Sequence, residues 1–135
     1  MKQCTCGPIG PNSNSDLVKS FMNVYGQEVM IEPVLPEEQT IKLRYKLIEE
    51  ELAELKVALL DRDIISTADA LTDLLYVVYG AGHAFGINLD ACFAEVHRSN
   101  MSKLDEDGHP IRREDGKILK SRLYSPPDLM SILSK

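Results

Sequence analysis

The chain has 135 residues, of which 44% are hydrophobic, and this fits one small globular domain. Its net charge of −6 argues against a general nucleic-acid-binding protein, because such proteins usually present a basic surface. The start of the chain lacks the apolar stretch of a secretory signal, and its apolar runs are shorter than the ~18 residues of a membrane span. We therefore expect a cytoplasmic protein that binds neither nucleic acid nor a membrane.

The first third of the chain predicts a tail, one helix and a connector. Residues 1–15 are rich in Gly, Pro, Asn and Ser and predict a flexible tail. Ser15 or Asp16 can cap a first helix, which Gly26 ends. After a connector, Pro36 and the two glutamates that follow it are typical of the first turn of a new helix.

Two long helices are predicted next, at about 37–60 and 62–85. Apolar residues of the first recur at steps of seven, four, three and four, which predicts one apolar stripe made of Ile41, Ile48, Leu52, Leu55 and Leu59. The second is apolar or small at nearly every position from Ala68 to Ile87, which is typical of a buried helix.

The last third predicts one more long helix and then a change of character. Asn88 is a suitable cap for a helix that runs to about Ser102. Two Asp-Gly turn dipeptides follow, and the segment around them predicts a short hairpin or an ordered loop. A short helix is expected after Pro126. We predict an all-α helical bundle of four to five helices, divided into a tail (1–15), a helical catalytic domain (16–104) and a basic C-terminal extension packed on that domain (105–135).

Two carboxylates lie on the most apolar predicted helix. Asp69 and Asp73 are four residues apart and therefore share one face. Carboxylates on a buried helix are costly unless they are paired or bind a metal ion. No Lys or Arg lies between residues 63 and 97 to pair with them. This lack of bases favours a metal site over a structural ion pair.

Three glutamates lie on the flank of the preceding helix. At 100° per residue, Glu51, Glu54 and Glu50 lie about 60°, 120° and 160° from Ile48 around the helix. If the two helices form a hairpin, these glutamates face Asp69 and Asp73, and the charges repel one another unless a divalent cation neutralises them. Mg²⁺ suits such a site because it takes oxygen ligands and retains waters.

These motifs resemble those of the MazG-like all-α NTP pyrophosphohydrolases, a superfamily that includes dimeric dUTPases and phosphoribosyl-ATP pyrophosphohydrolase. The family pattern Glu-Glu-x-x-Glu stands here as Glu50-Glu51-Leu52-Ala53-Glu54, and the Asp-Leu-Leu of its second half begins at Asp73. The family glutamate three residues before that aspartate is replaced by Ala70. Asp69 stands in for it, or supports the ligands from outside the metal's coordination sphere, or the site has one ligand fewer.

The resemblance covers residues 40–103 and implies a site and a reaction. Glu50, Glu51, Glu54 and Asp73 would hold Mg²⁺, with Mn²⁺ as a substitute, and one of the three glutamates would act as the base. Asp69 is added to these predicted ligands on its charge and its place on the apolar helix alone. The resemblance places Asn100 and Lys103 on the nucleotide and its phosphates. It compares the basic tail with a segment that closes over the substrate, which adds Lys117 and Lys120 to the predicted substrate-binding residues. Tyr76 is expected to line the pocket for the base.

The implied activity is cleavage of a (d)NTP between its α- and β-phosphates to a nucleoside monophosphate and pyrophosphate, with house-cleaning of dUTP or non-canonical nucleotides as its role. Hydrolysis of phosphoribosyl-ATP in histidine synthesis is the first alternative, and a non-enzymatic helical interaction domain is the second. A protomer of this size encloses a nucleotide poorly, and members of the superfamily are oligomers, so we expect a homodimer or homotetramer.

Overall fold

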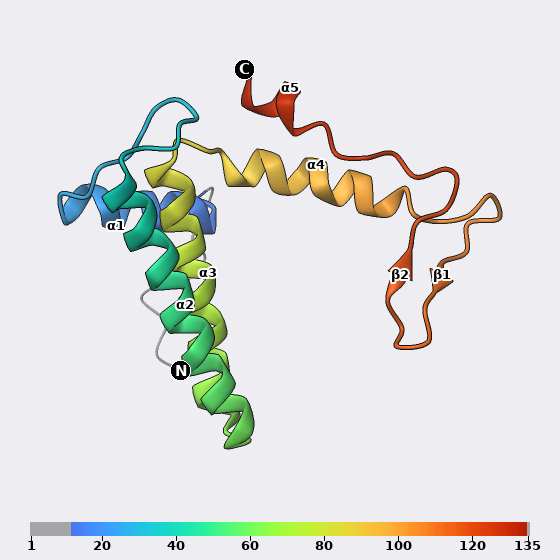
Figure 1. The fold of residues 1–135 in the computed structure, drawn as a ribbon, viewed down its shortest axis with the longest axis horizontal. Helices are drawn as coiled ribbons and strands as arrows, with labels where there is room; N and C mark the ends of the chain where they lie inside the picture. The colour runs from blue at the N-terminus through green and yellow to red at the C-terminus, as the bar shows by residue number, and fades with distance from the viewer. Residues whose placement is uncertain (1–11, 135) are drawn as a thin grey trace, which may run out of the picture. The chain divides into compact units, whose positions relative to one another are not determined.

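The structure, a computed structural model of the chain, describes residues 12–134. Its elements, in chain order, are α1 (Asn14–Val24), α2 (Glu38–Leu60), α3 (Ile64–Ala84), α4 (Leu89–Met101), β1 (Ile111–Arg112), β2 (Ile118–Leu119) and α5 (Leu129–Leu133) (Figure 1). The helices confirm the predicted all-α class. The segment after α4 forms the short hairpin, with β1 and β2 paired antiparallel.

The chain divides into two compact units, one that ends at Ile87 and one that begins at Asn88. The first unit contains α1, α2 and α3, and the second contains α4, the hairpin and α5. The sequence had suggested a division at residues 104 and 105, with α4 among the helices before it. The predicted tail of residues 1–15 lies mostly outside the described residues, but its last two residues already belong to α1. The packing of the extension on the helical domain stays a prediction.

Two reciprocal hydrogen bonds cap the start of α1 at Ser13, two residues before Ser15, the first of the predicted caps. The Ser13 hydroxyl accepts a hydrogen bond from the Asp16 amide at 3.1 Å, and the Asp16 carboxylate accepts one from the Ser13 amide at 3.1 Å. This pair satisfies two of the amides that a helix start leaves without partners. The cap fixes the direction in which α1 leaves, so that Val18 and Met22 are buried.

We expect Ser13→Ala to lower the free energy of unfolding by about 1 kcal/mol, because one amide in the first turn loses its acceptor. Urea denaturation followed by circular dichroism measures this. Ser20→Ala is the control, since Ser20 is exposed on the same helix. Equal effects of the two substitutions would show that the cap is not formed in solution.

The helices α2 and α3 form a hairpin through a turn of three residues, Asp61 to Asp63, and lie side by side (Figure 1). Arg62 has φ 53°, the left-handed conformation with which many helices end. Asp63 then caps α3, and its side chain accepts hydrogen bonds from the amides of Ile65 at 3.0 Å and Ser66 at 3.1 Å. The predicted boundaries of both helices agree with the structure to within two residues.

The face of α2 that packs on α3 is not centred on the predicted apolar stripe. The buried residues of α2 are Arg44 and Ala58, whereas Leu52 and Leu59 are each 55% exposed. Arg44 fits because it lies against Gly80 of α3, where a β-carbon would stand 2.8 Å from Nη1. Its Nη2 donates to Gln27 Oε1 at 3.4 Å, and burial lowers the pKa of its guanidinium. The predicted hairpin is therefore confirmed, but its contact face is rotated.

The connector between α1 and α2 covers the C-terminal end of α3. The amides of Met30 and Val34 donate to the carbonyls of His83 at 2.9 Å and Phe85 at 2.8 Å. The next residue, Gly86, has φ +67° and lies directly against the Glu32 carbonyl. These bonds satisfy carbonyls that a helix end leaves free, and they hold the connector in place.

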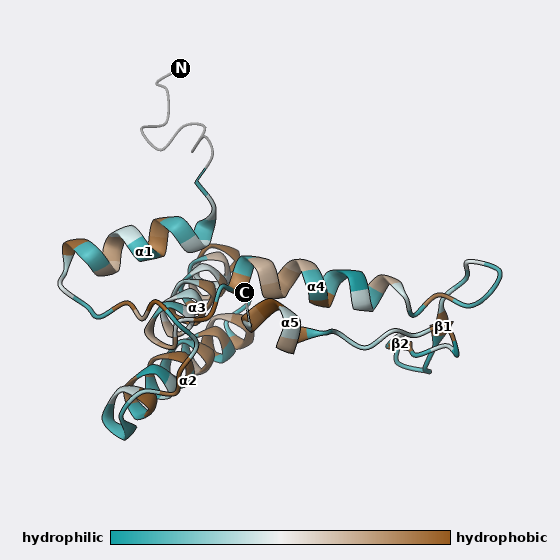
Figure 2. Ribbon diagram, turned by 90° about the horizontal axis from the view of Figure 1, so that it is seen from above, coloured by the Kyte–Doolittle hydropathy of each residue, from teal (hydrophilic) through white to brown (hydrophobic). Residues whose placement is uncertain are grey.

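By length and composition alone, α3 could cross a membrane. The core helix of a soluble protein has the same properties, so one such helix is weak evidence. Figure 2 shows apolar residues along α2 as well as α3, interspersed with polar ones. Asp69 and Asp73 lie within α3, and carboxylates are costly in lipid. The expectation that the protein does not span a membrane stays a prediction.

In the second unit, the C-terminal segment is tied to α4 by polar contacts. Glu95 accepts two hydrogen bonds from Arg98 and one from the Asp128 amide at 2.7 Å, and Arg98 first, then that amide, lower the pKa of Glu95 to about 2. Arg98 also donates to the carbonyl of Pro126 at 3.1 Å. In the hairpin, Ile111 pairs with Leu119. The unit is therefore held mainly by hydrogen bonds rather than by a large apolar core.

Candidate metal and phosphate site

An acidic groove of about 460 Å³ lies between α2 and α3 near their shared turn. Its lining comes from one side of each helix and consists of Ala53, Glu54, Val57, Ala58, Asp61, Ser66, Asp69, Ala70 and Asp73. Three of the four carboxylates in this set were predicted from the sequence. No Lys or Arg is among the described lining residues, so the charges have no counter-ion within the groove.

Glu51 lies at the inner edge of the same cluster. Its side chain is half-buried, and Oε2 is buried without a hydrogen-bond partner among the described residues. The pKa of Glu51 is raised to about 7, first by the neighbouring Glu54 carboxyl, with which it can share a proton, then by burial, and then by the charges of Glu54, Asp73 and Asp69. A buried oxygen without a donor is suited to a cation.

Asp73, on the opposite helix, is perturbed by the same charges. Its pKa is raised, first by burial and then by the charges of Asp69 and Glu54. Groups that raise one another's pKa are close enough to repel, and such repulsion is relieved by protonation or by a divalent ion. The structure thus brings Glu51, Glu54, Asp69 and Asp73 together, as the hairpin hypothesis expected.

Glu50 is placed differently from the other predicted ligands. It is exposed and is not among the residues that line the groove. Glu51, Arg44 and Ala58 lie on the side of α2 that faces α3. Glu50 lies about 100° around α2 from Glu51 and therefore points away from that side. Its role as a ligand or base stays a prediction that rests on the family pattern.

Two polar residues that line the groove, Asp61 and Ser66, were not predicted from the sequence, although the spacing of Asp61 indicates its position. Asp61, the first residue after α2, follows Glu54 by seven residues and therefore continues the same face of that helix. Ser66 gave no comparable signal. Ala70, which stands where the family has glutamate, is buried and lines the groove, and Asp69 lines it as well. A carboxylate is therefore present in this part of the groove even though residue 70 supplies none.

Tyr76 lies one turn after Asp73, on α3. It meets Phe21 of α1 edge to face, with ring centroids 5.5 Å apart. It also borders a cavity of about 240 Å³ between the two helices, lined by Asn14, Leu17, Val18, Thr72, Leu75, Tyr76 and Tyr79. The first unit therefore contains an apolar cavity between α1 and α3 as well as the acidic groove between α2 and α3.

The other predicted substrate residues belong to the second unit. Asn100 is exposed at the end of α4, Lys103 is half-buried, and Lys117 and Lys120 are exposed in the hairpin. Lys120 Nζ lies 4.7 Å from the centre of the Tyr124 ring. Their roles toward a substrate stay predictions.

The C-terminal extension is less basic than its arginines and lysines suggest. Residues 105–135 contain six Lys or Arg and six Asp or Glu. Arg113 pairs with Asp115 at 2.6 Å, and Arg122 pairs with Glu106. The other bases from β1 to Tyr124 form no ion pair with a described residue. They are Arg112, Lys117 and Lys120.

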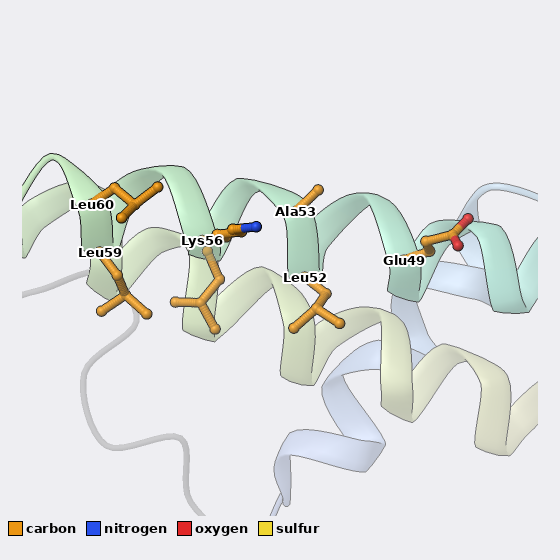
Figure 3. Close-up of a pocket in the computed structure, with 7 residues that line it drawn as sticks. Glu49, Leu52, Ala53, Lys56, Leu59 and Leu60 are labelled. Carbon is orange, nitrogen blue, oxygen red and sulfur yellow. The ribbon is translucent and has the colours of Figure 1, made fainter.

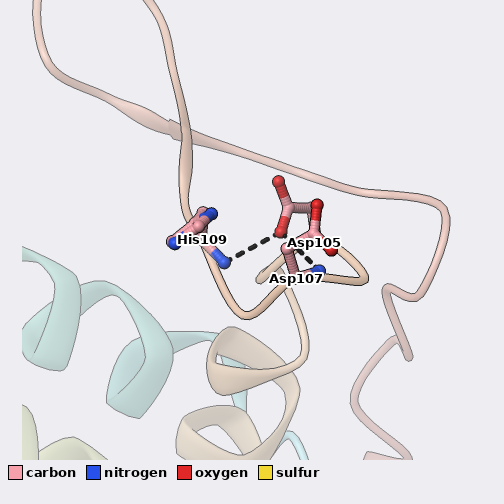
Figure 4. Close-up of side chains that lie close together, drawn as sticks. All are labelled: Asp105, Asp107 and His109. Atoms are coloured by element: carbon pink, nitrogen blue, oxygen red, sulfur yellow. Dashed lines mark hydrogen bonds between the residues drawn. The ribbon is translucent and has the colours of Figure 1, made fainter.

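A second group of potential ligands lies in the loop before the hairpin. Asp105, Asp107 and His109 each place one ligand atom within 4.8 Å of the others (Figure 4). Asp105 Oδ1 already accepts hydrogen bonds from the amides of Asp107 at 3.0 Å and His109 at 2.8 Å. These bonds close the turn and account for the arrangement without a metal ion.

The clustered carboxylates predict how the metal-free protein responds to pH. A raised pKa means that the folded state binds the proton of Glu51 more tightly than the unfolded state does. This contribution to stability is fully present below pH 4.5 and is lost as the pH rises through about 7. We expect Glu51→Gln to flatten this part of the stability profile, measured by urea denaturation with a chelator at several pH values. A variant that keeps the wild-type slope would contradict this cause.

Comparison with known proteins places these features in a family. The profile of the phosphoribosyl-ATP pyrophosphohydrolase family matches residues 18–100. The uncharacterised protein L479 of Acanthamoeba polyphaga mimivirus is 43% identical over 72 residues, which are 53% of this chain and 26% of that protein. The chain therefore spans about a quarter of the length of this curated relative.

A solved structure shows a more distant likeness. It is that of a proposed NTP pyrophosphohydrolase from Exiguobacterium sp. 255-15, which is 25% identical with a TM-score of 0.47 over 88% of this chain and 91% of that one. The family profile confirms the superfamily resemblance and supports pyrophosphohydrolase activity in general terms. Because it matches more than half of the chain and includes the whole acidic groove, the chain belongs to the phosphoribosyl-ATP pyrophosphohydrolase family.

Proposed function

We propose that the protein is a Mg²⁺-dependent pyrophosphohydrolase that cleaves a nucleoside triphosphate between its α- and β-phosphates. The products would be a nucleoside monophosphate and pyrophosphate. The observation that supports this best is the cluster of Glu51, Glu54, Asp69 and Asp73 at a groove that has no Lys or Arg among its described lining residues. Family membership supports the type of reaction, and the groove supports the need for a metal ion.

The donor set fits Mg²⁺, since it offers carboxylate oxygens from two rigid helices and one buried oxygen that has no hydrogen-bond partner in the described part of the chain. Glu51, Glu54 and Asp73 would hold the ion, with Asp69 as the carboxylate that replaces the family's glutamate. When bound, the ion would lower the pKa of an attacking water and offset the negative charge of the phosphates. Mn²⁺ has similar preferences for oxygen ligands and should substitute.

The chain's own residues would supply the remaining chemistry. One glutamate of the cluster would orient the attacking water and accept its proton, for which a pKa near neutrality is suitable. Lys103 would stabilise charge that develops on the phosphates, and Asn100 would bind the nucleotide. Lys117 and Lys120 would contact the phosphate chain as further cations.

The cavity beside Tyr76 would receive the nucleobase. Its seven lining residues provide apolar walls, two tyrosine rings and the amide of Asn14, and aromatic walls favour planar rings. Tyr76 and Thr72 lie within about one turn of Asp73, so a base in the cavity would leave its phosphates near the carboxylates.

Phosphoribosyl-ATP is the second candidate substrate, because the matching family carries its name. Its adenine bears an additional ribose phosphate, which needs a cation close to the base. The cavity has no Lys or Arg among its described lining residues, and this favours a plain nucleoside triphosphate.

A substrate panel with Mg²⁺ or Mn²⁺ tests the proposal. It should contain the common NTPs and dNTPs, dUTP, modified nucleotides and phosphoribosyl-ATP, with pyrophosphate and phosphate measured separately. We expect pyrophosphate from at least one triphosphate and none with a chelator. Exclusive use of phosphoribosyl-ATP would favour the second candidate, and no release from any substrate would favour a non-enzymatic interaction domain.

A further inference from the structure

Arg44 is a buried cation with little to hold it in place. It is 8% exposed on the side of α2 that packs on α3, and its Nε has no hydrogen-bond partner among the described residues. Its Nη2 donates a long bond of 3.4 Å to Gln27 Oε1. An apolar side chain of similar length would fill the same space at less cost, because it leaves no buried N–H without an acceptor. Stability alone therefore does not explain why an arginine is buried here.

The guanidinium of Arg44 lies on Gly80 of α3, in space that the missing side chain leaves. A β-carbon at residue 80 would stand 2.8 Å from Nη1 and 3.9 Å from Cζ, so any other residue would displace the guanidinium. Glycine weakens the interior of a helix, and Gly80 lies within α3. Both residues of the contact are thus unfavourable for stability, but they fit the two helices to each other at one point.

A second apolar side of α2 competes for the contact with α3. Figure 3 shows Leu52, Leu59 and Leu60 along a shallow groove on α2, and they are 55%, 55% and 73% exposed. These leucines lie about 60° to 160° around α2 from Arg44. Burying leucines in place of an arginine would remove more apolar surface from water. Hydrophobic burial therefore does not select the observed face of α2, and a more specific contact is needed to select it.

Equal spacings connect the Arg44–Gly80 contact with the acidic cluster. Glu51 follows Arg44 by seven residues on α2, and Asp73 precedes Gly80 by seven residues on α3. Seven residues are nearly two turns, so each pair shares a face and is separated by about 10.5 Å along its helix. Because α2 and α3 are antiparallel in their hairpin, the contact of Arg44 with Gly80 places Glu51 at the level of Asp73.

We propose that Arg44 is a positioning residue, whose contact with Gly80 sets the register of α2 against α3. The register in turn places Glu51 and Glu54 against Asp73 for a divalent cation. A shift of one residue would move the carboxylates of α2 by about 1.5 Å along the axis. Mg²⁺ requires its oxygen ligands at about 2 Å in nearly ideal octahedral geometry, so such a shift would weaken binding. The inference rests on the metal site of the proposed function.

Arg44→Met separates positioning from stability. Methionine fills a similar volume, but it is flexible and adapts to irregular gaps, so it does not fix the register. The urea midpoint of the metal-free protein should stay the same or rise, because the buried N–H without a partner is gone. The dissociation constant for Mn²⁺, measured by electron paramagnetic resonance without nucleotide, should nevertheless rise about tenfold. A purely structural residue would lower the midpoint and leave the dissociation constant unchanged.

Gly80→Ala tests the other side of the same contact. Its methyl group would take the space of the guanidinium, whose flexible end can move aside, so the fold should survive while the dissociation constant for Mn²⁺ again rises about tenfold. Because both substitutions break one contact, the double variant should bind Mn²⁺ about as tightly as either single variant. Effects that multiply in the double variant would show that the two residues act independently, and this would overturn the proposal.

Lys46→Met is the matched control for the loss of charge. Lys46 is an exposed base on α2, closer in sequence to Glu51 than Arg44 is, and its charge is screened by solvent, so Mn²⁺ binding should not change. Wild-type affinity for Mn²⁺ in both Arg44→Met and Gly80→Ala would overturn the positioning role. A wild type that binds Mn²⁺ but releases no pyrophosphate would instead contradict the proposed function, while the variants would still decide the role of Arg44.

Discussion

Replacing Glu54 with Gln, or Asp73 with Asn, should reduce pyrophosphate release at least about a hundredfold, because each change removes a carboxylate that the metal ion needs. The two side chains come from different helices and take part in the same cluster. The measurement is the initial rate of pyrophosphate formation with the best substrate of the panel. Excess Mg²⁺ should recover part of the loss if metal affinity is the main cause.

The stability of these variants separates loss of function from loss of fold. Removing one negative charge from a repelling cluster should leave the metal-free protein as stable as the wild type, or more so. Glu38→Gln is the matched control, since Glu38 is exposed on α2 and its one ion pair among the described residues is with Lys42. If Glu54→Gln and Asp73→Asn both retain wild-type turnover, this groove is not the site of the reaction.

Gly86→Ala should destabilise the first unit by at least about 3 kcal/mol, the range reached by backbone strain together with a steric clash. A β-carbon at residue 86 would stand 2.0 Å from the Glu32 carbonyl oxygen and 2.5 Å from its carbon. Both atoms belong to the backbone, so the connector itself would have to move. Urea denaturation of the two proteins gives the difference.

Gly26→Ala separates the two causes. Gly26 has φ +71°, close to the +67° of Gly86, but no atom of residues 12–134 lies within 4 Å of its added β-carbon. Gly26→Ala should therefore lower the free energy of unfolding only by the cost of the left-handed backbone conformation, about 1–2 kcal/mol. A Gly86→Ala variant no less stable than Gly26→Ala would mean that the connector does not lie against residue 86 in solution.

Much of the first unit could be predicted because local rules decide it. The steps between apolar residues gave the extents of α2 and α3, and the absence of bases beside Asp69 and Asp73 gave the acidic cluster. These features depend on residues close in sequence, where helical periodicity applies. The predicted cap of α1 was wrong by two residues because Ser13, Ser15 and Asp16 are all good caps and only the structure selects among them.

What could not be predicted depends on contacts between elements. A buried Arg44 contradicts the usual location of arginine, and it requires the space that Gly80 leaves on another helix. That contact rotates α2 so that Leu52 and Leu59 remain exposed and Glu50 stays outside the groove. A pattern within one helix shows which residues share a face, but it does not show which of two neighbouring faces the partner helix covers.

The three-residue turn between α2 and α3 also bears on how the protein is made. Pairing across so short a connection costs little chain entropy, so the hairpin can form quickly once α3 has emerged from the ribosome. In contrast, α1 reaches α3 through residues as distant in sequence as Ser15 and His83, whose side chains lie 3.1 Å apart. Because α1 is synthesised first, Val18 and Met22 stay uncovered until α3 follows, and this is the interval in which the nascent chain is most exposed to aggregation.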